Sequence, residues 1–126
     1  MSWLYKDQVI DNISQIPDGV IGFVYRITNT ETEQWYIGKK FLYTTRRLPP
    51  LKGFKRKRKV TKESDWLSYR SSSEIVKNWQ SITKRILVYA YSKKDLTYLE
   101  TKYLFKEEAL EDHNCMNSNI LGKFFR

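Results

Sequence analysis

The segments Gly22-Phe-Val-Tyr-Arg-Ile-Thr-Asn29 and Gln34-Trp-Tyr-Ile-Gly-Lys-Lys40 decide the fold that we expect for this chain. Both are rich in β-branched and aromatic residues, apolar side chains alternate along them, and the polar residues 30–33 lie between them. This pattern is typical of two antiparallel strands joined by a turn. We therefore predict a β-hairpin with strands over residues 20–28 and 34–40, each of which carries a tyrosine.

Length and composition indicate a single domain that comprises residues 1–126. No apolar run reaches the roughly 20 residues of a membrane span, and the N-terminus, with Asp7, does not resemble a secretory signal. Cys115 is the only cysteine and His113 the only histidine, which excludes an internal disulfide and a Cys/His zinc site. We expect a cytoplasmic protein that does not interact with membranes.

The positive charge of the chain is concentrated in its middle. The net charge is +9, and residues 39–62 contain eleven Lys or Arg and no acidic residue. Residues 95–112 instead contain six acidic residues and two lysines. A cationic run on a basic domain is the electrostatic pattern expected of proteins that bind nucleic-acid phosphates. A solvated basic surface is the alternative interpretation.

The basic middle of the chain is predicted to be a loop. Residues 48–54 contain two prolines and a glycine, which interrupt a helix because proline lacks the amide donor and clashes with the preceding turn. Residues 55–59 are all Lys or Arg, and their charges repel one another unless an anion is present. We therefore expect an inserted basic loop over about residues 41–70, ordered by DNA.

The remaining segments predict three helices and one further strand. A short helix is favoured from about residue 7 and ends at the turn 17–19. A second helix is expected over residues 71–84, where serines precede a glutamate in a capping-box pattern. A third strand follows over 85–91, and a long helix over 93–112. The predicted class is α/β (α+β), with a small three-stranded antiparallel sheet flanked by helices.

The last predicted helix places a carboxylate beside an apolar face. Leu96, Leu99 and Tyr103 share one side of this helix, and Glu100 lies at its edge. A carboxylate there is costly unless it is paired or binds a metal ion. Glu107 lies near the same edge, so the helical spacing alone does not choose between the two glutamates. Pairing with a lysine at the rim is the alternative for either one.

The hairpin segments resemble a known family signature. Phe23-Val-Tyr25 and Tyr36-Ile-Gly38 resemble the paired motif of the GIY-YIG endonucleases, although Phe-Val replaces the usual Gly-Ile. The predicted helix, strand and glutamate-bearing helix follow in the family's order, and Asn117-Ser-Asn-Ile120 resembles its closing segment. The resemblance covers roughly residues 3–120 and implies the GIY-YIG nuclease fold. Further segments that look like small stand-alone phage members are 36–40, 48–53, 62–66, Tyr69 and 71–72.

The resemblance implies roles for two tyrosines, a glutamate and an asparagine. Tyr25 and Tyr36 match the motif tyrosines, which in the family lie near the scissile phosphate and include one thought to help activate the attacking water. Glu100 matches the single metal-binding glutamate and would hold Mg²⁺ or Mn²⁺. Asn117 matches the asparagine that braces the site, and Asn119 is a weaker match.

The family also implies a catalytic arginine on a helix, eight residues after the motif glycine. Counting from Gly38 gives Arg46, but Arg47-Leu-Pro-Pro follows it, so that helix is short or absent. Arg47 and Arg70 are the alternatives for this role. Arg70 stands where related members often have glycine before the serines.

Cations close to the tyrosines are expected to serve both catalysis and DNA binding. Lys39, Lys40 and Arg46 would favour a phenolate, although a free tyrosine titrates near about 10, and would also hold the phosphate. The residues predicted to bind DNA are Lys39, Lys40, Arg47, Lys55, Arg56, Lys57, Arg58, Lys59 and Arg70.

The primary hypothesis is a metal-dependent DNA endonuclease of the homing type, encoded by a phage and located in the host bacterial cytoplasm. Its expected partner is double-stranded DNA, with specificity from the basic loop, from a homodimer or from a protein partner. One alternative is a DNA-binding protein on the same scaffold that does not cut. Another is a basic RNA-binding or assembly protein that acts through residues 55–59.

Overall fold

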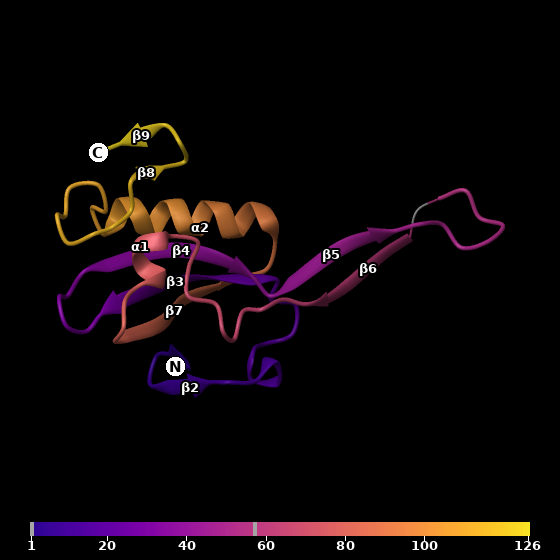
Figure 1. Ribbon diagram of the computed structural model, residues 1–126, viewed down its shortest axis with the longest axis horizontal. Coiled ribbons are helices and arrows are strands. Elements are labelled where there is room, and N and C mark those ends of the chain that lie inside the picture. The colour runs from indigo at the N-terminus through magenta and orange to yellow at the C-terminus, as the bar shows by residue number, and fades with distance from the viewer. Residues whose placement is uncertain (1, 57) are drawn as a thin grey trace.

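A five-stranded mixed sheet forms the body of the protein (Figure 1). The computed structural model describes residues 2–56 and 58–126. Neighbouring strands run antiparallel except β1 and β7, which run parallel. The predicted mixed class is confirmed, but the sheet has five strands rather than three. Across the sheet these are β2 (Gln8–Ile10), β1 (Trp3–Tyr5), β7 (Ile82–Ala90), β3 (Gly22–Asn29) and β4 (Trp35–Phe41).

The predicted hairpin is confirmed as the antiparallel pair β3 and β4. Tyr25 lies opposite Gly38, and Ile27 lies opposite Tyr36. Because side chains alternate along a strand, both tyrosines lie on the same face of the sheet. The turn is closed by Asn29, whose side-chain oxygen accepts a hydrogen bond of 2.9 Å from the following backbone.

Each face of the sheet carries its own hydrophobic core. On one face Phe23 and Tyr25 pack with Trp3 and Trp66. On the other face the helix α2 (Lys93–Lys106) covers β3, β4 and β7, and its Leu96 is completely buried (Figure 1). Ser92 caps this helix by accepting a hydrogen bond of 3.1 Å from the backbone of the first turn. The hairpin is therefore fixed from both sides, while β4 forms one edge of the sheet.

The helix predicted near the N-terminus is wrong, since the segment forms β1, β2 and a short 3-10 helix, η1 (Ile13–Gln15). Trp3 is fully buried, and its indole nitrogen donates a hydrogen bond of 2.7 Å to the carbonyl of Trp66. Pairing with β7 satisfies the backbone of the N-terminal segment and places this tryptophan in the core. Tertiary burial has therefore overridden the local preference for a helix.

The helix predicted over residues 71–84 is also much shorter than expected. The helix α1 spans only Glu74–Lys77, and its N-cap Ser73 makes no side-chain capping bond. From Ile82 onward the chain pairs with β3, because a central sheet position buries this strand more completely than a helix end would. At the other boundary, α2 ends at Lys106 rather than at residue 112.

The predicted basic loop is instead largely a β-ribbon. The strands β5 (Tyr43–Leu48) and β6 (Arg58–Glu63) pair antiparallel and project from the body (Figure 1). The prolines that we expected to break regular structure lie beyond β5, in the turn at the far end. Regular pairing therefore continues up to the prolines and resumes after residue 57.

The C-terminal segment closes the fold over α2. It forms the small hairpin of β8 (Asn119–Ile120) and β9 (Phe124–Phe125). Within the described residues, no helix is both long and apolar enough to cross a membrane.

Candidate active site

The first feature of the site is a phenol that lies over the glycine of the neighbouring strand. Tyr25 is 1% exposed, and its ring lies 6.4 Å from that of Tyr36, centroid to centroid. A Cβ atom added to Gly38 would lie 2.6 Å from Cζ of Tyr25, far inside van der Waals contact. Position 38 therefore has to be glycine so that the Tyr25 ring can cross the strand.

The segment that connects β6 to α1 completes the environment of the phenols. The ring of Tyr69 packs edge-on against Tyr25 with 5.9 Å between centroids. Burial raises the pKa of both phenols, and hydrogen bonding to Ser71 partly offsets this effect on Tyr25, as hydrogen bonding to Ser72 does on Tyr36. In the sequence, Tyr69 appears only within the family resemblance, and the serines appear there and in the capping-box pattern of the expected helix; neither signal predicts a place beside the phenols.

Burial keeps both phenols neutral. It raises the pKa of Tyr25 far above its ordinary value and is the main cause of the raised pKa of Tyr36, to which the charge of Glu100 also contributes. The expectation that nearby cations favour a phenolate is therefore wrong for this site, because burial is the main influence on both phenols and raises their pKa values. A neutral phenol acts as a hydrogen-bond donor.

Glu100 lies in a polar cavity together with one of the tyrosines. The cavity has a volume of about 510 Å³, and its lining includes Tyr36, Lys39, Ser72, Glu100 and Asn117. Burial raises the pKa of the Glu100 carboxyl, and the charge of Lys39 partly offsets this effect. Among the residues that the structure describes, none forms a hydrogen bond or ion pair with this carboxylate. By contrast, Glu107 is the exposed C-cap of α2, so the geometry places Glu100, and not Glu107, in the cavity.

Asn117 clamps the strand that carries the second tyrosine. Its side-chain nitrogen donates to the carbonyl of Ile37 at 2.8 Å, and its side-chain oxygen accepts from the backbone nitrogen of Ile37 at 3.0 Å. The thiol of Cys115 donates to the same oxygen at 3.2 Å. Because Ile37 lies between Tyr36 and Gly38, this buried amide fixes the backbone of both. Asn119 also lines the cavity, but its side-chain oxygen accepts from Gly122.

None of the three candidate arginines lines this cavity. Arg46 is exposed on β5, on a strand rather than on the expected helix, and lies opposite Val60. Arg47 is its exposed neighbour. Arg70 is half-buried and donates to the carbonyl of Trp79, while its Nε is buried without a partner. The structure thus brings together Tyr25, Tyr36, Glu100 and Asn117, and separates the arginine from them.

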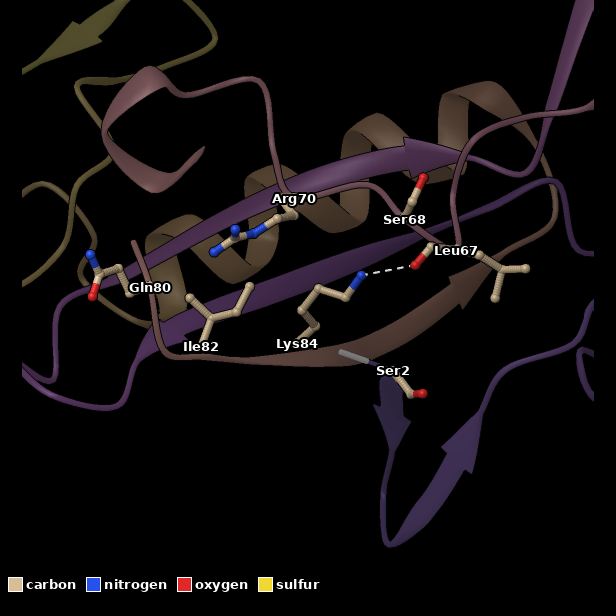
Figure 2. Close-up of a pocket in the computed structure, with 7 residues that line it drawn as sticks. All are labelled: Ser2, Leu67, Ser68, Arg70, Gln80, Ile82 and Lys84. Carbon is tan, nitrogen blue, oxygen red and sulfur yellow. Dashed lines mark hydrogen bonds between the residues drawn. The ribbon is translucent and has the colours of Figure 1, made fainter. Parts of the chain in front are cut away.

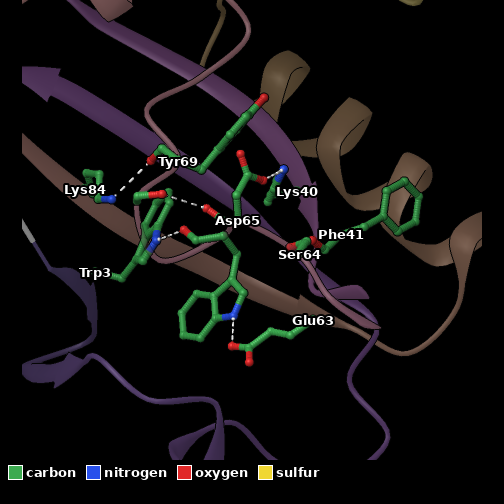
Figure 3. A network of polar contacts seen from close by, with 10 residues as sticks. Trp3, Lys40, Phe41, Glu63, Ser64, Asp65, Tyr69 and Lys84 are labelled. Carbon is green, nitrogen blue, oxygen red and sulfur yellow. Dashed lines mark hydrogen bonds and ion pairs between the residues drawn. The ribbon is translucent and has the colours of Figure 1, made fainter. Parts of the chain in front are cut away.

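The two lysines that follow the motif glycine have specific partners. Lys39 donates a hydrogen bond of 2.9 Å to the hydroxyl of Thr97 on α2. Lys40 forms an ion pair of 2.6 Å with Asp65 and lies 4.0 Å above the ring of Tyr69 (Figure 3). This ion pair lowers the pKa of Asp65. Lys40 therefore connects β4 to the segment that carries Tyr69.

The other predicted DNA contacts lie on the ribbon. Lys55 and Arg56 are exposed in the turn at its far end, and the next lysine, Lys57, lies outside the described residues. Arg58 and Lys59 are the first two residues of β6. Of the basic residues predicted from the sequence, Lys39 lines the cavity, Lys40 and Arg70 contact other parts of the body, and the other described ones lie on the ribbon and its turn.

A buried lysine holds the segment that carries Tyr69 through hydrogen bonds to its backbone carbonyls. Lys84 on β7 is 2% exposed, and its ammonium donates hydrogen bonds of 3.0 Å to the carbonyls of Leu67 and Tyr69 (Figures 2 and 3). It also lies 4.4 Å from the ring of Trp3. Burial, together with the charge of Arg70, lowers the pKa of Lys84 to about 8. No motif or pattern in the sequence points to this residue, which looks like an ordinary polar position in a strand.

The donor set of the cavity is compatible with a single hard cation. Glu100 is the one acidic residue in its lining, and it is half-buried without a partner among the described residues. The described residues contain no cluster of three or more metal-binding side chains. Mg²⁺ is suited to such a site, because it keeps several waters and often binds through one or two carboxylates together with substrate phosphates.

Comparison with known proteins identifies the family. The family model described as "Putative endonuclease segE, GIY-YIG domain" matches residues 3–120. No match was found among curated proteins or among solved structures. The matched region includes the hairpin with its two tyrosines, the glutamate of α2 and the asparagine clamp. The chain therefore belongs to the GIY-YIG endonuclease family, in its segE-like group.

Proposed function

We propose that the protein hydrolyses phosphodiester bonds of double-stranded DNA with Mg²⁺, or Mn²⁺, held by Glu100. The observation that carries this proposal is the meeting of Tyr36, Lys39, Glu100 and Asn117 in one polar cavity. A half-buried carboxylate without a partner costs stability, so its position needs a functional reason. We also propose that the enzyme is a phage-encoded, free-standing homing-type nuclease that acts in the host cytoplasm.

Each residue of the cavity has a distinct chemical task in this proposal. The bound cation would act as a Lewis acid on the phosphate and lower the pKa of a bound water. Tyr36, as a neutral phenol, donates a hydrogen bond to a phosphate oxygen or orients the attacking water. Lys39 offsets the negative charge of the phosphate, and Asn117 keeps the strand beneath Tyr36 in place.

A plasmid-cleavage assay with matched glutamate variants tests the proposal. We expect wild-type protein to convert supercoiled plasmid to relaxed or linear forms with Mg²⁺ and to be inactive in EDTA. Glu100→Gln should cut at least about 100-fold more slowly, because it loses the charge that holds the cation. Glu107→Gln, which changes an exposed glutamate of the same helix, should cut as the wild type does. Equal cleavage by Glu100→Gln and wild type would overturn the assignment of Glu100.

A DNA-binding protein that does not cut is the second candidate. Two observations favour this candidate. Arg46 does not line the cavity, and burial keeps the phenols neutral, so neither an arginine nor a phenolate supplies charge beside the phosphate. In the same assay this candidate predicts that wild-type protein leaves the plasmid intact with Mg²⁺ and with Mn²⁺. Electrophoretic mobility shifts in EDTA would nevertheless show binding to the plasmid-derived duplex.

A further inference from the structure

Among the described residues, the ribbon formed by β5 and β6 contributes no side chain to either hydrophobic core. All side chains from Tyr43 to Arg47 are exposed, as are those of Val60, Thr61 and Lys62. An isolated two-stranded ribbon is only marginally stable in water. It is attached at its base, where the backbone nitrogen of Ser64 donates to the carbonyl of Leu42 at 2.7 Å. Such an exposed ribbon gains stability from a partner that covers it.

The cross-strand register makes the ribbon cationic on both faces. Thr44 lies opposite Lys62 and Arg46 opposite Val60, so these four side chains share one face. The neighbouring positions, which include Arg47, point to the other face. Glu63, the acidic residue at the base of the ribbon, accepts a hydrogen bond of 2.7 Å from the indole of Trp66, so its carboxylate is directed toward the body. The partner must accordingly be anionic on both sides of the ribbon.

The dimensions and side chains of the ribbon match one anionic surface in particular. The major groove of B-DNA is about 12 Å wide and admits a two-stranded ribbon, whereas the minor groove of about 6 Å does not. Phosphates line both walls of the groove, which suits cations on both faces. Arginine recognises guanine through O6 and N7, threonine hydroxyls bond either kind of base edge, and an apolar side chain can contact the thymine methyl. One face of the ribbon supplies all three kinds of side chain, with Arg46, Thr44 and Val60.

We propose that the β5–β6 ribbon lies in the major groove of duplex DNA and reads base edges there, with Arg46 as the guanine-reading side chain. The proposal rests on the proposed DNA substrate, and it assigns to Arg46 a role in specificity rather than in catalysis. It also explains why this arginine lies on a projecting strand while Tyr36, Glu100 and Asn117 meet in the cavity. The basic residues of the turn then contact the flanking phosphates.

The test is a binding experiment without metal, so it does not depend on cleavage. Duplexes bound by the wild type are enriched from a randomised library in EDTA, and each guanine of an enriched site is then replaced in turn. Replacement by 7-deazaguanine removes the major-groove N7 acceptor, whereas inosine removes only the minor-groove amino group. We expect about tenfold weaker binding with 7-deazaguanine at one or more positions, and little change with inosine.

Protein variants assign the effect to the ribbon. Arg46→Lys keeps the charge but loses the bidentate geometry, so it should bind random duplex nearly as the wild type does while losing the guanine preference. Arg85→Ala, which removes an exposed arginine from β7, should keep both properties. No enrichment of any sequence, no effect of 7-deazaguanine, or an unchanged preference in Arg46→Lys would overturn the inference. A protein that reads guanine but never cuts would instead sink only the proposed nuclease function.

Discussion

At the scale of single residues, the contact between Gly38 and Tyr25 makes a sharp prediction. Gly38→Ala places a methyl group 2.6 Å from Cζ of the Tyr25 ring, in a part of the core where both residues are buried. We expect the free energy of unfolding to fall by about 1–3 kcal/mol, as is usual for overpacked cores. Urea denaturation followed by tryptophan fluorescence measures this loss.

A second substitution tests whether the collision itself is the cause. The closest atom to the added methyl group is the hydroxyl oxygen of Tyr25, so Tyr25→Phe removes part of the clash. The double variant Gly38→Ala/Tyr25→Phe should therefore lose less stability than the sum of the two single variants. Strict additivity would mean that Gly38 is required for some other reason than the ring above it.

The partly buried carboxylate of Glu100 is expected to lower the stability of the fold while it serves the proposed metal site. Its pKa is raised from 4.5 in the folded protein, so the unfolded chain releases the proton first as the pH rises. Between 4.5 and the folded-state pKa the native state binds more protons, and stability falls with increasing pH. Above the folded-state pKa the full cost of burying the charge is present. Glu100→Gln should therefore be more stable than the wild type at pH 7, although inactive, and this difference should vanish at low pH.

Denaturant midpoints at pH 7 and at a pH below 4.5 measure this effect. Glu107→Gln is the control, because it removes an exposed carboxylate from the same helix. A Glu100→Gln protein less stable than the wild type at pH 7 would contradict the interpretation, since the carboxylate would then make a stabilising contact in the fold.

At the scale of secondary-structure elements, the sequence predicts best those elements whose pattern lies within the element itself. The hairpin and the start of α2 were correct, because alternation of apolar residues and the Ser92 cap lie within the elements themselves. The N-terminal strands and the early start of β7 were missed, because they exist through pairing with distant strands. Local sequence contains no trace of a partner some 80 residues away.

The residues of the candidate site show the same dependence on local sequence patterns. The two tyrosines, Glu100 and Asn117 were found through ordered motifs, and the structure brings them together. Arg46 was assigned by counting from Gly38, which assumed a helix where the chain forms β5 instead. The support from Lys84 was missed because its partners are backbone carbonyls, which have no sequence signature.

Lys84 predicts how the Tyr69 segment depends on pH. The pKa of Lys84 is lowered from 10.5 to about 8 in the folded protein, so between these values the unfolded chain binds more protons. Stability should therefore rise with pH from about 8 to 10.5 through this residue. Lys84→Met should lack this rise and should also loosen the segment 67–72, which its ammonium holds through two carbonyls.

Two measurements separate these effects. Denaturant midpoints between pH 7 and pH 10.5 report the stability term, and hydrogen exchange of the amides in 67–72 reports the loosening. Lys94→Met, an exposed lysine of α2, should show the wild-type profile in both. Unchanged exchange in Lys84→Met would mean that the segment is held by Lys40 and Asp65 alone.

At the scale of the whole molecule, the charge distribution divides the protein into two parts. The body carries the cavity and, with the base of the ribbon, all of the acidic residues, whereas residues 44–62, which form the rest of the ribbon and its turn, contain nine Lys or Arg and no acidic residue. Association with a polyanion should therefore begin at the ribbon and depend strongly on salt. Cleavage chemistry should depend on the body, since the cavity contains no ribbon residue.

Replacing the ribbon separates these two contributions. Tyr43 and Glu63 are cross-strand partners at its base, so residues 44–62 can be replaced by Asn-Gly, a two-residue turn suited to a hairpin. We expect the shortened protein to keep its fold, with a melting temperature within a few degrees of the wild type, because no ribbon residue whose side chain the structure describes belongs to either core. Its DNA affinity should fall, and the slope of log Kd against log salt should become shallower by about 0.9 for each lost phosphate contact.

The shortened protein also decides between the functional alternatives. A nuclease whose chemistry lies in the body should still cut short duplexes slowly at low salt, and should lose that activity on Glu100→Gln. A protein that acts only through its basic ribbon should lose all nucleic-acid binding when the ribbon is removed. An unchanged affinity and salt slope would show that DNA approaches the body directly, in which case Lys39 and the cavity, rather than the ribbon, provide the first contact.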